Sequence, residues 1–228
     1  MSPTSTTVSA VIPAYNEEKM VAEVLTVVKN SPLVEEVVVV NDGSTDHTLT
    51  QIHKVSGIRV VNLEKNTGKA NAVAEGILHA HGKIILLVDA DLGGLTNNSI
   101  QVLLRPLLDR RTDVTIGYPV HYKFLDFIFR PLAGERAYFK KDLLPYLDAV
   151  RAKGYGLELF LNFTFREKRI QPIPLPEIYQ PLKYEKQDWP TTIRQTIKQT
   201  YQIIREVVTQ KNPFRFFHGA YLKHFFLR

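Results

Sequence analysis

Two carboxylates, one residue apart, follow the most apolar run of the chain. The run 83–88 (KIILLV) leads directly to Asp89 and Asp91. Such a run is typical of a strand buried on both faces of a parallel sheet, and open α/β sheets bind ligands at the carboxyl ends of their strands. Two carboxylates there are costly unless positive charge joins them, so the pair suits a hard divalent cation with a phosphate-bearing substrate. The alternative is an aspartate pair that only caps the next helix or turn.

Polar turns also follow the three strands predicted upstream of this run. The strand 8–13 leads into 14–18 (AYNEE), where Asn16 can cap a helix that ends near residue 29. The strand 37–40 leads into 41–46 (NDGSTD), where Ser44 or Thr45 can cap a second helix, and the strand 58–63 leads into 64–69 (EKNTGK). Three βα units and a further strand predict a parallel sheet with right-handed crossovers, whose polar turns converge on one edge.

Further elements are predicted downstream. A helix is expected over 97–109, a strand over 113–118, a short helix near 141–146 and a helix that ends near 167. A late strand, 169–175, is interrupted by two prolines, and a final helix from 191 to about 209 carries one apolar stripe. The expected organisation is a catalytic domain over 1–187 and an amphipathic helical extension over 188–228.

Composition limits the function classes without choosing among them. The chain has 228 residues, of which 44% are hydrophobic, and a formal net charge of +6. This charge suits phosphate-bearing substrates, nucleic acid or an anionic membrane surface. The absence of cysteine excludes disulfides and cysteine-based zinc sites. No signal peptide is visible and no apolar run reaches about 20 residues, so we expect a cytoplasmic protein without a membrane span.

The last eighteen residues, 211–228, combine aromatic and basic side chains. Six phenylalanine and tyrosine residues alternate there with lysine and arginine, and the segment holds no acidic residue. This pattern favours a segment that lies in the interface of an anionic membrane, which would make the protein peripheral at the cytoplasmic face. The alternative is a segment that packs on its own domain or on a second subunit in a homodimer.

The four strand-end segments taken together resemble one enzyme family. The sequences VSAVIPAYNEE, VVVVNDGSTD, NTGKANAV and LLVDAD stand in the order and at the spacing of nucleotide-sugar-dependent glycosyltransferases of family 2. The resemblance covers roughly residues 7–175. It implies the α/β fold called GT-A, a Rossmann-like, mostly parallel sheet flanked by helices.

The resemblance also implies roles for the residues at these strand ends. The nucleotide base and ribose would be lined by Pro13, Ala14, Tyr15 and Glu17. Asp42 would hydrogen-bond the base, usually uracil or guanine, while Gly68 and Lys69 would approach the phosphates. Asp91 would contact Mn²⁺ or Mg²⁺ directly, and Asp89 would face the metal or the nucleotide. The metal would act as a Lewis acid on the leaving diphosphate.

Two later segments resemble the acceptor side of small family 2 enzymes such as glucosyl-3-phosphoglycerate synthases. They are PLAGERA at 131–137 and GYGLE at 154–158. By this resemblance Arg136 would hold a phosphate or carboxylate, and Glu158 would deprotonate an acceptor hydroxyl. With a phosphate acceptor, which is already anionic, Glu158 would instead orient the sugar or a metal-bound water. Glu158 could equally be a structural carboxylate at a helix start.

One departure from the family pattern concerns the third metal ligand. Many relatives place a histidine a few residues before a sequence like that of 183–186 (KYEK), whereas this chain has Gln180. Either Gln180 or water would complete the metal site, or His218 or His224 would return from the tail.

The sequence is compatible with several functions. The favoured one is sugar transfer from a UDP- or GDP-sugar to a lipid-linked or polyprenyl-phosphate acceptor, because the tail suits a membrane. The alternative is transfer to a small phosphorylated acceptor such as 3-phosphoglycerate. A sugar-phosphate nucleotidyltransferase is disfavoured, since the turn 14–18 contains no glycine. A nucleic-acid-binding protein is disfavoured because the basic residues are dispersed up to the tail.

Overall fold

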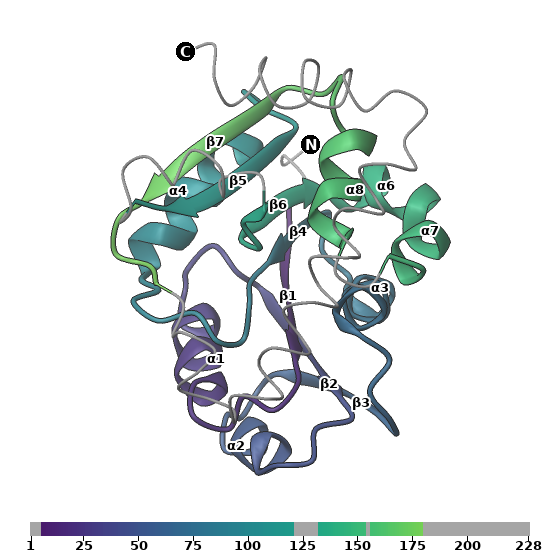
Figure 1. Ribbon diagram of the computed structural model, residues 1–228. Coiled ribbons are helices and arrows are strands. Elements are labelled where there is room, and N and C mark those ends of the chain that lie inside the picture. The colour runs from purple at the N-terminus through teal and green to yellow at the C-terminus, as the bar shows by residue number, and fades with distance from the viewer. Residues whose placement is uncertain (1–5, 121–131, 154–155, 180–228) are drawn as a thin grey trace, which may run out of the picture.

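A seven-stranded sheet forms the centre of the protein (Figure 1). The structure is a computed structural model that describes residues 6–120, 132–153 and 156–179. The strands are β1 (Val8–Ala14), β2 (Glu36–Asp42), β3 (Arg59–Leu63), β4 (Ile84–Leu87), β5 (Val114–Pro119), β6 (Arg136–Phe139) and β7 (Ile170–Leu175). Their order in the sheet is β3-β2-β1-β4-β6-β5-β7. The expected α/β architecture, a mostly parallel sheet flanked by helices, is confirmed.

Helices cover both faces of the sheet. They are α1 (Val21–Lys29), α2 (Thr48–His53), α3 (Lys69–His79), α4 (Asn97–Leu108), α6 (Lys140–Leu143), α7 (Leu147–Arg151) and α8 (Leu157–Thr164), with a 3₁₀ turn at Leu144–Tyr146. Alternate strand residues face opposite sides, so Ile12 packs with α1, α2 and α4, whereas Val11 packs with α3, α7 and α8. The two apolar clusters hold the strand ends in fixed positions.

β6 is the strand that the sequence analysis did not predict. It runs antiparallel to both of its neighbours, β4 and β5. Its register sets Arg136 opposite Leu87, which is the last residue of β4. Because β6 is antiparallel, its first residue lies at the same edge as the carboxyl ends of the parallel strands. The segment before β6 is therefore brought to the edge that carries Asp89.

Two predicted helix starts are wrong. α1 begins at Val21 rather than after Asn16. Asn16 has a left-handed backbone (φ 55°), and its Oδ1 accepts the N–H of Thr45 at 2.9 Å, so it ties the first turn to the second. α2 begins at Thr48, beyond the cap expected at residues 44–45, and Asp46 Oδ1 accepts the N–H of Thr48 at 2.9 Å. The residues between the expected and the observed helix starts form the two linked turns instead of helix.

The predicted extension 188–228 and the final helix lie outside the described residues. Among the helices that the structure does describe, none has the length and apolar character needed to cross a bilayer. Within the described residues, the polar turns at the ends of β1, β2, β4 and β6 meet at one edge of the sheet.

Candidate active site

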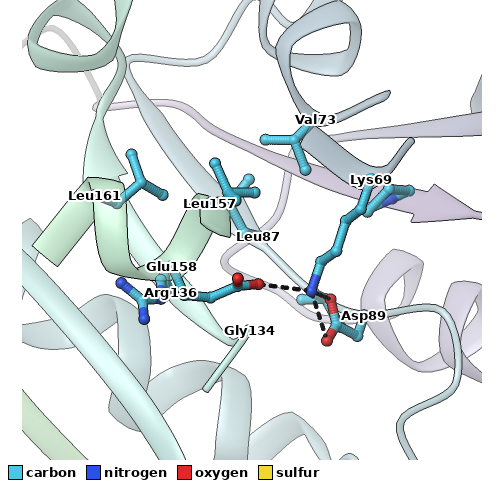
Figure 2. A pocket seen from close by; sticks show the side chains of 11 residues that line it. Lys69, Val73, Leu87, Asp89, Gly134, Arg136, Leu157, Glu158 and Leu161 are labelled. Atoms are coloured by element: carbon cyan, nitrogen blue, oxygen red, sulfur yellow. Dashed lines mark hydrogen bonds and ion pairs between the residues drawn. The ribbon is translucent and has the colours of Figure 1, made fainter. Parts of the chain in front are cut away.

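A lysine at the start of α3 joins two carboxylates from distant parts of the chain. Lys69 Nζ lies 2.7 Å from Asp89 Oδ1 and 2.9 Å from Glu158 Oε1 (Figure 2). The two acidic side chains are each 13% exposed, and that of Lys69 is 32% exposed. Burial alone would lower the pKa of Lys69, but the two carboxylates outweigh it and raise the pKa above its ordinary value. The site therefore holds a permanent positive charge between two acids.

Asp42 builds the turn that presents Lys69. Its Oδ1 accepts the N–H and hydroxyl of Thr67, both at 2.8 Å, and its Oδ2 accepts the N–H of Gly68 at 2.8 Å. Gly68 has a positive φ of 97°, a conformation that favours glycine, and α3 begins at the next residue. Asp42 is 2% exposed. The expected contact of Asp42 with a nucleotide base stays a prediction, and its observed role is to shape the loop.

Glu158 comes from the first turn of α8, as the sequence predicted. The same helix face carries Asn162, one turn later, which accepts a hydrogen bond from Arg136 Nη1 at 2.7 Å. Arg136 is 1% exposed, and its Nε donates to the Ala133 carbonyl at 2.7 Å. Its expected contact with a phosphate or carboxylate of the acceptor stays a prediction. In the structure, Nε and Nη1 both donate to protein groups.

The segment before β6 closes over Asp89. A Cβ added at Gly134 would lie 2.3 Å from Asp89 Oδ2, so only glycine lets the backbone come this close. The next residue, Glu135, is 2% exposed, and its Oε1 is buried without a hydrogen-bond partner among the described residues. Burial, reinforced by the charge of Asp89, raises the pKa of Glu135 to about 8. A third acidic side chain thus lies near the aspartate pair.

The chain after β7 returns to the segment that follows Asp91. Tyr179 and Gly93 exchange backbone hydrogen bonds, with N–O distances of 2.8 and 3.0 Å. Gln180, the expected third ligand, follows Tyr179 but lies outside the described residues, as do His218 and His224. The described chain nevertheless leads to within one residue of Gln180 at the side of Asp91.

The described residues offer a partial donor set for a divalent cation. No group of three or more histidine, cysteine or acidic residues in the described ranges is arranged to hold a metal. Asp89 and Asp91 nevertheless provide two hard oxygen donors, and Glu135, whose buried Oε1 has no hydrogen-bond partner among the described residues, lies near them. Mg²⁺ is commonly bound by one or two carboxylates together with substrate phosphates. The residues present fit such a shared site.

The residues expected at the nucleotide base lie on and after β1. Pro13 lines the pocket of Figure 2, and Ala14, the last residue of β1, is 2% exposed. Tyr15 is 40% exposed, which leaves its ring accessible. The backbone N–H of Glu17 donates to Thr48 Oγ1 at 2.7 Å, and its carbonyl accepts from the N–H groups of Met20 and Val21 at the start of α1. These four residues share the edge of the sheet with Lys69 and Asp89.

Comparison with known proteins decides the family. The model of the family described as glycosyl transferase family 2 matches residues 9–167, which is more than half of the chain. The chain belongs to glycosyl transferase family 2. This confirms the resemblance seen in the four strand-end motifs, and the GT-A fold with it.

Relatives of the chain include enzymes whose names refer to lipid phosphates. A dolichyl-phosphate beta-glucosyltransferase of Trichomonas vaginalis is 38% identical over 117 residues, covering 43% of this chain and 36% of the relative. A dodecaprenyl-phosphate galacturonate synthase of Rhizobium johnstonii is 33% identical over 119 residues, covering 48% and 35%. The chain thus spans about a third of the length of these relatives.

The fold is similar to that of a solved bacterial enzyme. A glucosyl-3-phosphoglycerate synthase of Mycobacterium tuberculosis, crystallised with Mn²⁺, UDP and glucosyl-3-phosphoglycerate, superposes with a TM-score of 0.72 at 23% identity. The match covers 90% of this chain and 79% of that one. At this identity the similarity concerns the fold alone.

Sequence reasoning missed two residues of the site, Glu135 and Asn162. Both are polar and 2% exposed. Each stands in a largely apolar stretch, where a single polar residue is ordinarily expected at the surface. The only local signal for Glu135 was its place within the PLAGERA segment. No local signal marked Asn162, because its partner Arg136 is distant in sequence.

Proposed function

We propose that this family 2 chain carries the catalytic domain of a glycosyltransferase that moves a sugar from a UDP- or GDP-sugar to a lipid-linked phosphate acceptor. The observation that supports it most directly is the Lys69 centre at the carboxyl edge of the sheet. There, an ammonium group lies between Asp89, on the donor side, and Glu158, on the acceptor side. The lipid-phosphate relatives support the acceptor class.

The donor would bind along the ends of β1, β2 and β4. Tyr15, with its accessible ring, would stack on the base, and the loop shaped by Asp42 would approach the ribose and phosphates. Lys69 would neutralise part of the diphosphate charge that develops as the sugar leaves. Asp89 and Asp91 would hold Mn²⁺ or Mg²⁺, which would supply Lewis-acid stabilisation of the same charge.

Glu158 would act on the acceptor. Toward a hydroxyl acceptor it would serve as the general base, while a lipid phosphate is already anionic and needs no strong base. In the phosphate case, Glu158 would hold Lys69 in place and orient the sugar. The second candidate, a small phosphorylated acceptor, is favoured by the PLAGERA and GYGLE segments and uses the same residues.

A nucleotide-sugar panel is the experiment that tests this proposal. Each UDP- and GDP-sugar is added with Mn²⁺, and the melting temperature is recorded, since a ligand that binds only the native state raises it. The best donor is then assayed for sugar transfer to polyprenyl phosphate and to 3-phosphoglycerate. Transfer to neither, with no donor-dependent shift, would contradict the proposal.

Asp91→Ala sharpens the test of the metal. We expect this variant to fold and to lose metal-dependent turnover, whereas Asp148→Ala, which alters a 98% exposed carboxylate on α7, keeps full turnover. Full activity of Asp91→Ala in the presence of a chelator would exclude the proposed metal role.

Membrane association is part of the same proposal. The segment 211–228 would bring the site to the lipid acceptor through its aromatic and basic side chains. Removing 211–228 is expected to release the protein from anionic liposomes in co-sedimentation. If the whole chain never co-sediments, the segment serves another purpose, of which a homodimer contact is the first to test by ultracentrifugation.

A further inference from the structure

Arg136 is bonded on two sides by groups that lead to the Lys69 centre. Its Nη1 donates to Asn162 Oδ1 at 2.7 Å and to the Tyr138 hydroxyl at 3.2 Å, and its Nε donates to the Ala133 carbonyl at 2.7 Å. The side chain is 1% exposed. Hydrogen bonds to a charged donor inside a protein are stronger and shorter than neutral ones, so these contacts hold their partners firmly.

The first side of this arrangement leads to Glu158. Asn162 lies four residues after Glu158 in α8, and residues at this spacing share one face of a helix. Anchoring Asn162 to β6 therefore fixes the rotation of α8 about its axis. That rotation decides whether the Glu158 carboxylate reaches Lys69, which it does at 2.9 Å. Arg136 and Glu158 both line the pocket shown in Figure 2.

The second side leads to Asp89. The carbonyl that accepts from Arg136 Nε belongs to Ala133, directly before Gly134. Gly134 lies against the Asp89 carboxylate so closely that a Cβ there would meet Oδ2 at 2.3 Å. The hydrogen bond from Arg136 to the Ala133 carbonyl therefore also fixes the position of Gly134. That position limits the rotamers that Asp89 can adopt. One guanidinium group is connected in this way to both carboxylates that contact Lys69.

We propose that Arg136 and Asn162 form a brace that positions Glu158 and Asp89 on the two sides of Lys69. Asn162 is a positioning residue, which acts on the reaction only through Glu158. The effect of the brace on turnover rests on the proposed function, whereas its effect on the Lys69 contacts does not. The brace gives Arg136 a part in the site that requires no contact with the acceptor.

Asn162→Leu and Asn162→Asp separate the hydrogen bond from the volume of the side chain. Leucine fills a similar space without an acceptor, and aspartate keeps an acceptor of the same shape for Arg136. We expect Asn162→Leu to lower kcat at least about tenfold, because small displacements of a reacting group reduce rates strongly. Asn162→Asp should restore kcat to within about twofold of the wild type.

Thr115→Val provides a matched control. Thr115 is fully buried on β5, and its hydroxyl donates to the Leu103 carbonyl at 2.8 Å, away from the Lys69 centre. This variant also loses one buried hydrogen bond, so it should lower the melting temperature while leaving kcat unchanged. A fall in kcat that merely tracks the loss of stability would appear in both variants and would overturn the proposal.

Two double-mutant cycles decide the mechanism of Asn162. In a Glu158→Gln background, Asn162→Leu should have little further effect on kcat, because the group through which it acts is already altered. Independent effects that multiply would overturn the brace. The second cycle needs no substrate: Asn162→Leu should lower the melting temperature by about 2 °C or more beyond its effect in a Lys69→Met background.

The second cycle also keeps the two proposals distinguishable. If the wild type turns over no nucleotide sugar, the proposed function fails, and coupling between Asn162 and Lys69 in melting still supports the brace. Equal melting shifts in both backgrounds overturn the brace and leave the function intact. Should Asn162→Leu fail to fold, Asn162→Ala takes its place in both cycles, with the same outcomes.

Discussion

Lys69 Nζ lies 2.9 Å from Glu158 Oε1, although the two residues are 89 positions apart in the chain. The contact joins the start of α3, which follows the turn proposed to bind the donor, to the start of α8, on the proposed acceptor side. The same ammonium group also contacts Asp89. A change of charge on one side of the pocket therefore alters the electrostatic environment on the other side. The first prediction rests on this coupling.

Lys69→Met should lower kcat/KM for the donor by about 100-fold, the size typical of removing one stabilising donor from an active site. The substitution keeps the length of the side chain but leaves Asp89 and Glu158 without their shared ammonium group. Steady-state rates at saturating Mn²⁺ measure the effect. Lys54→Met is the control and should match the wild type, because Lys54 is exposed and its ammonium group donates to the side chain of Gln51 at 2.9 Å. A Lys69→Met enzyme with normal kcat/KM would refute the role of the lysine.

Gly134→Ala should impair cation and donor binding more than stability. The new methyl group would meet Asp89 Oδ2 at 2.3 Å and Cγ at 2.7 Å, so the carboxylate must leave its place beside Lys69. Titration with Mn²⁺, followed by electron paramagnetic resonance, should show weaker binding by about tenfold, equivalent to about 1.4 kcal/mol.

Gly57→Ala is the matched control for Gly134→Ala. Gly57 has a positive φ of 71°, and its new Cβ would meet only the end of the Lys29 side chain, at 3.4 Å. Alanine there costs about 1 kcal/mol of stability through backbone strain, and it should leave Mn²⁺ binding unchanged. Equal binding losses in both variants would mean that Gly134 acts through general stability.

The strands β1, β2 and β4 could be predicted from the sequence because strands buried on both faces of a parallel sheet consist of continuous apolar runs. The polar turns after these strands indicated the correct edge of the sheet, because the carboxyl ends of parallel strands lie at the same edge. β6 escaped prediction since its four residues (RAYF) begin with a charged side chain, and its pairing with β4 and β5 is set by distant partners. The sheet order could not be read from local patterns.

The contacts within the site were harder to predict than its membership. The motifs indicated that Asp42, Lys69, Asp89 and Glu158 belong to one site, and the structure places Lys69 in contact with the last two. The partners of Asp42 were not foreseen, because Thr67 and Gly68 reach it only when the turns after β2 and β3 meet. The burial of Arg136 was missed for a similar reason, since its partner Asn162 comes from a later helix.

Asp42→Asn should disorganise the loop 66–69. The carboxylate accepts three hydrogen bonds, whereas an asparagine amide would direct a donor at either Thr67 or Gly68. An unsatisfied buried donor costs about 1–3 kcal/mol, so urea unfolding should show a loss of that size. Donor binding should weaken as well, because Lys69 follows Gly68 directly.

Asp109→Asn is the control for Asp42→Asn, since its carboxylate is 49% exposed and pairs with the exposed Arg111. It should leave both the unfolding free energy and donor binding near wild-type values. If Asp42→Asn is as stable as the wild type but fails to bind nucleotide, Asp42 contacts the base directly, as the family resemblance implies.

Glu36 should make the fold sensitive to acid. Burial alone would raise the pKa of Glu36, but hydrogen bonds from the Ser9 hydroxyl and from the backbone and ring of His81 outweigh it and lower the pKa to about 2. Because the folded pKa lies below the unfolded value, the carboxylate stabilises the fold above about pH 4.5, and this contribution is lost as the pH falls toward 2. The full contribution is about 3 kcal/mol.

Urea unfolding at pH 6 and at pH 3 measures this dependence. Between these values the wild type should lose roughly 2 kcal/mol more of its unfolding free energy than Glu36→Gln, which cannot ionise. Glu23→Gln, which alters an exposed carboxylate on α1, should follow the wild type. Parallel losses in the wild type and Glu36→Gln would show that the Glu36 carboxylate, at the opposite end of β2 from Asp42, gains nothing from Ser9 and His81.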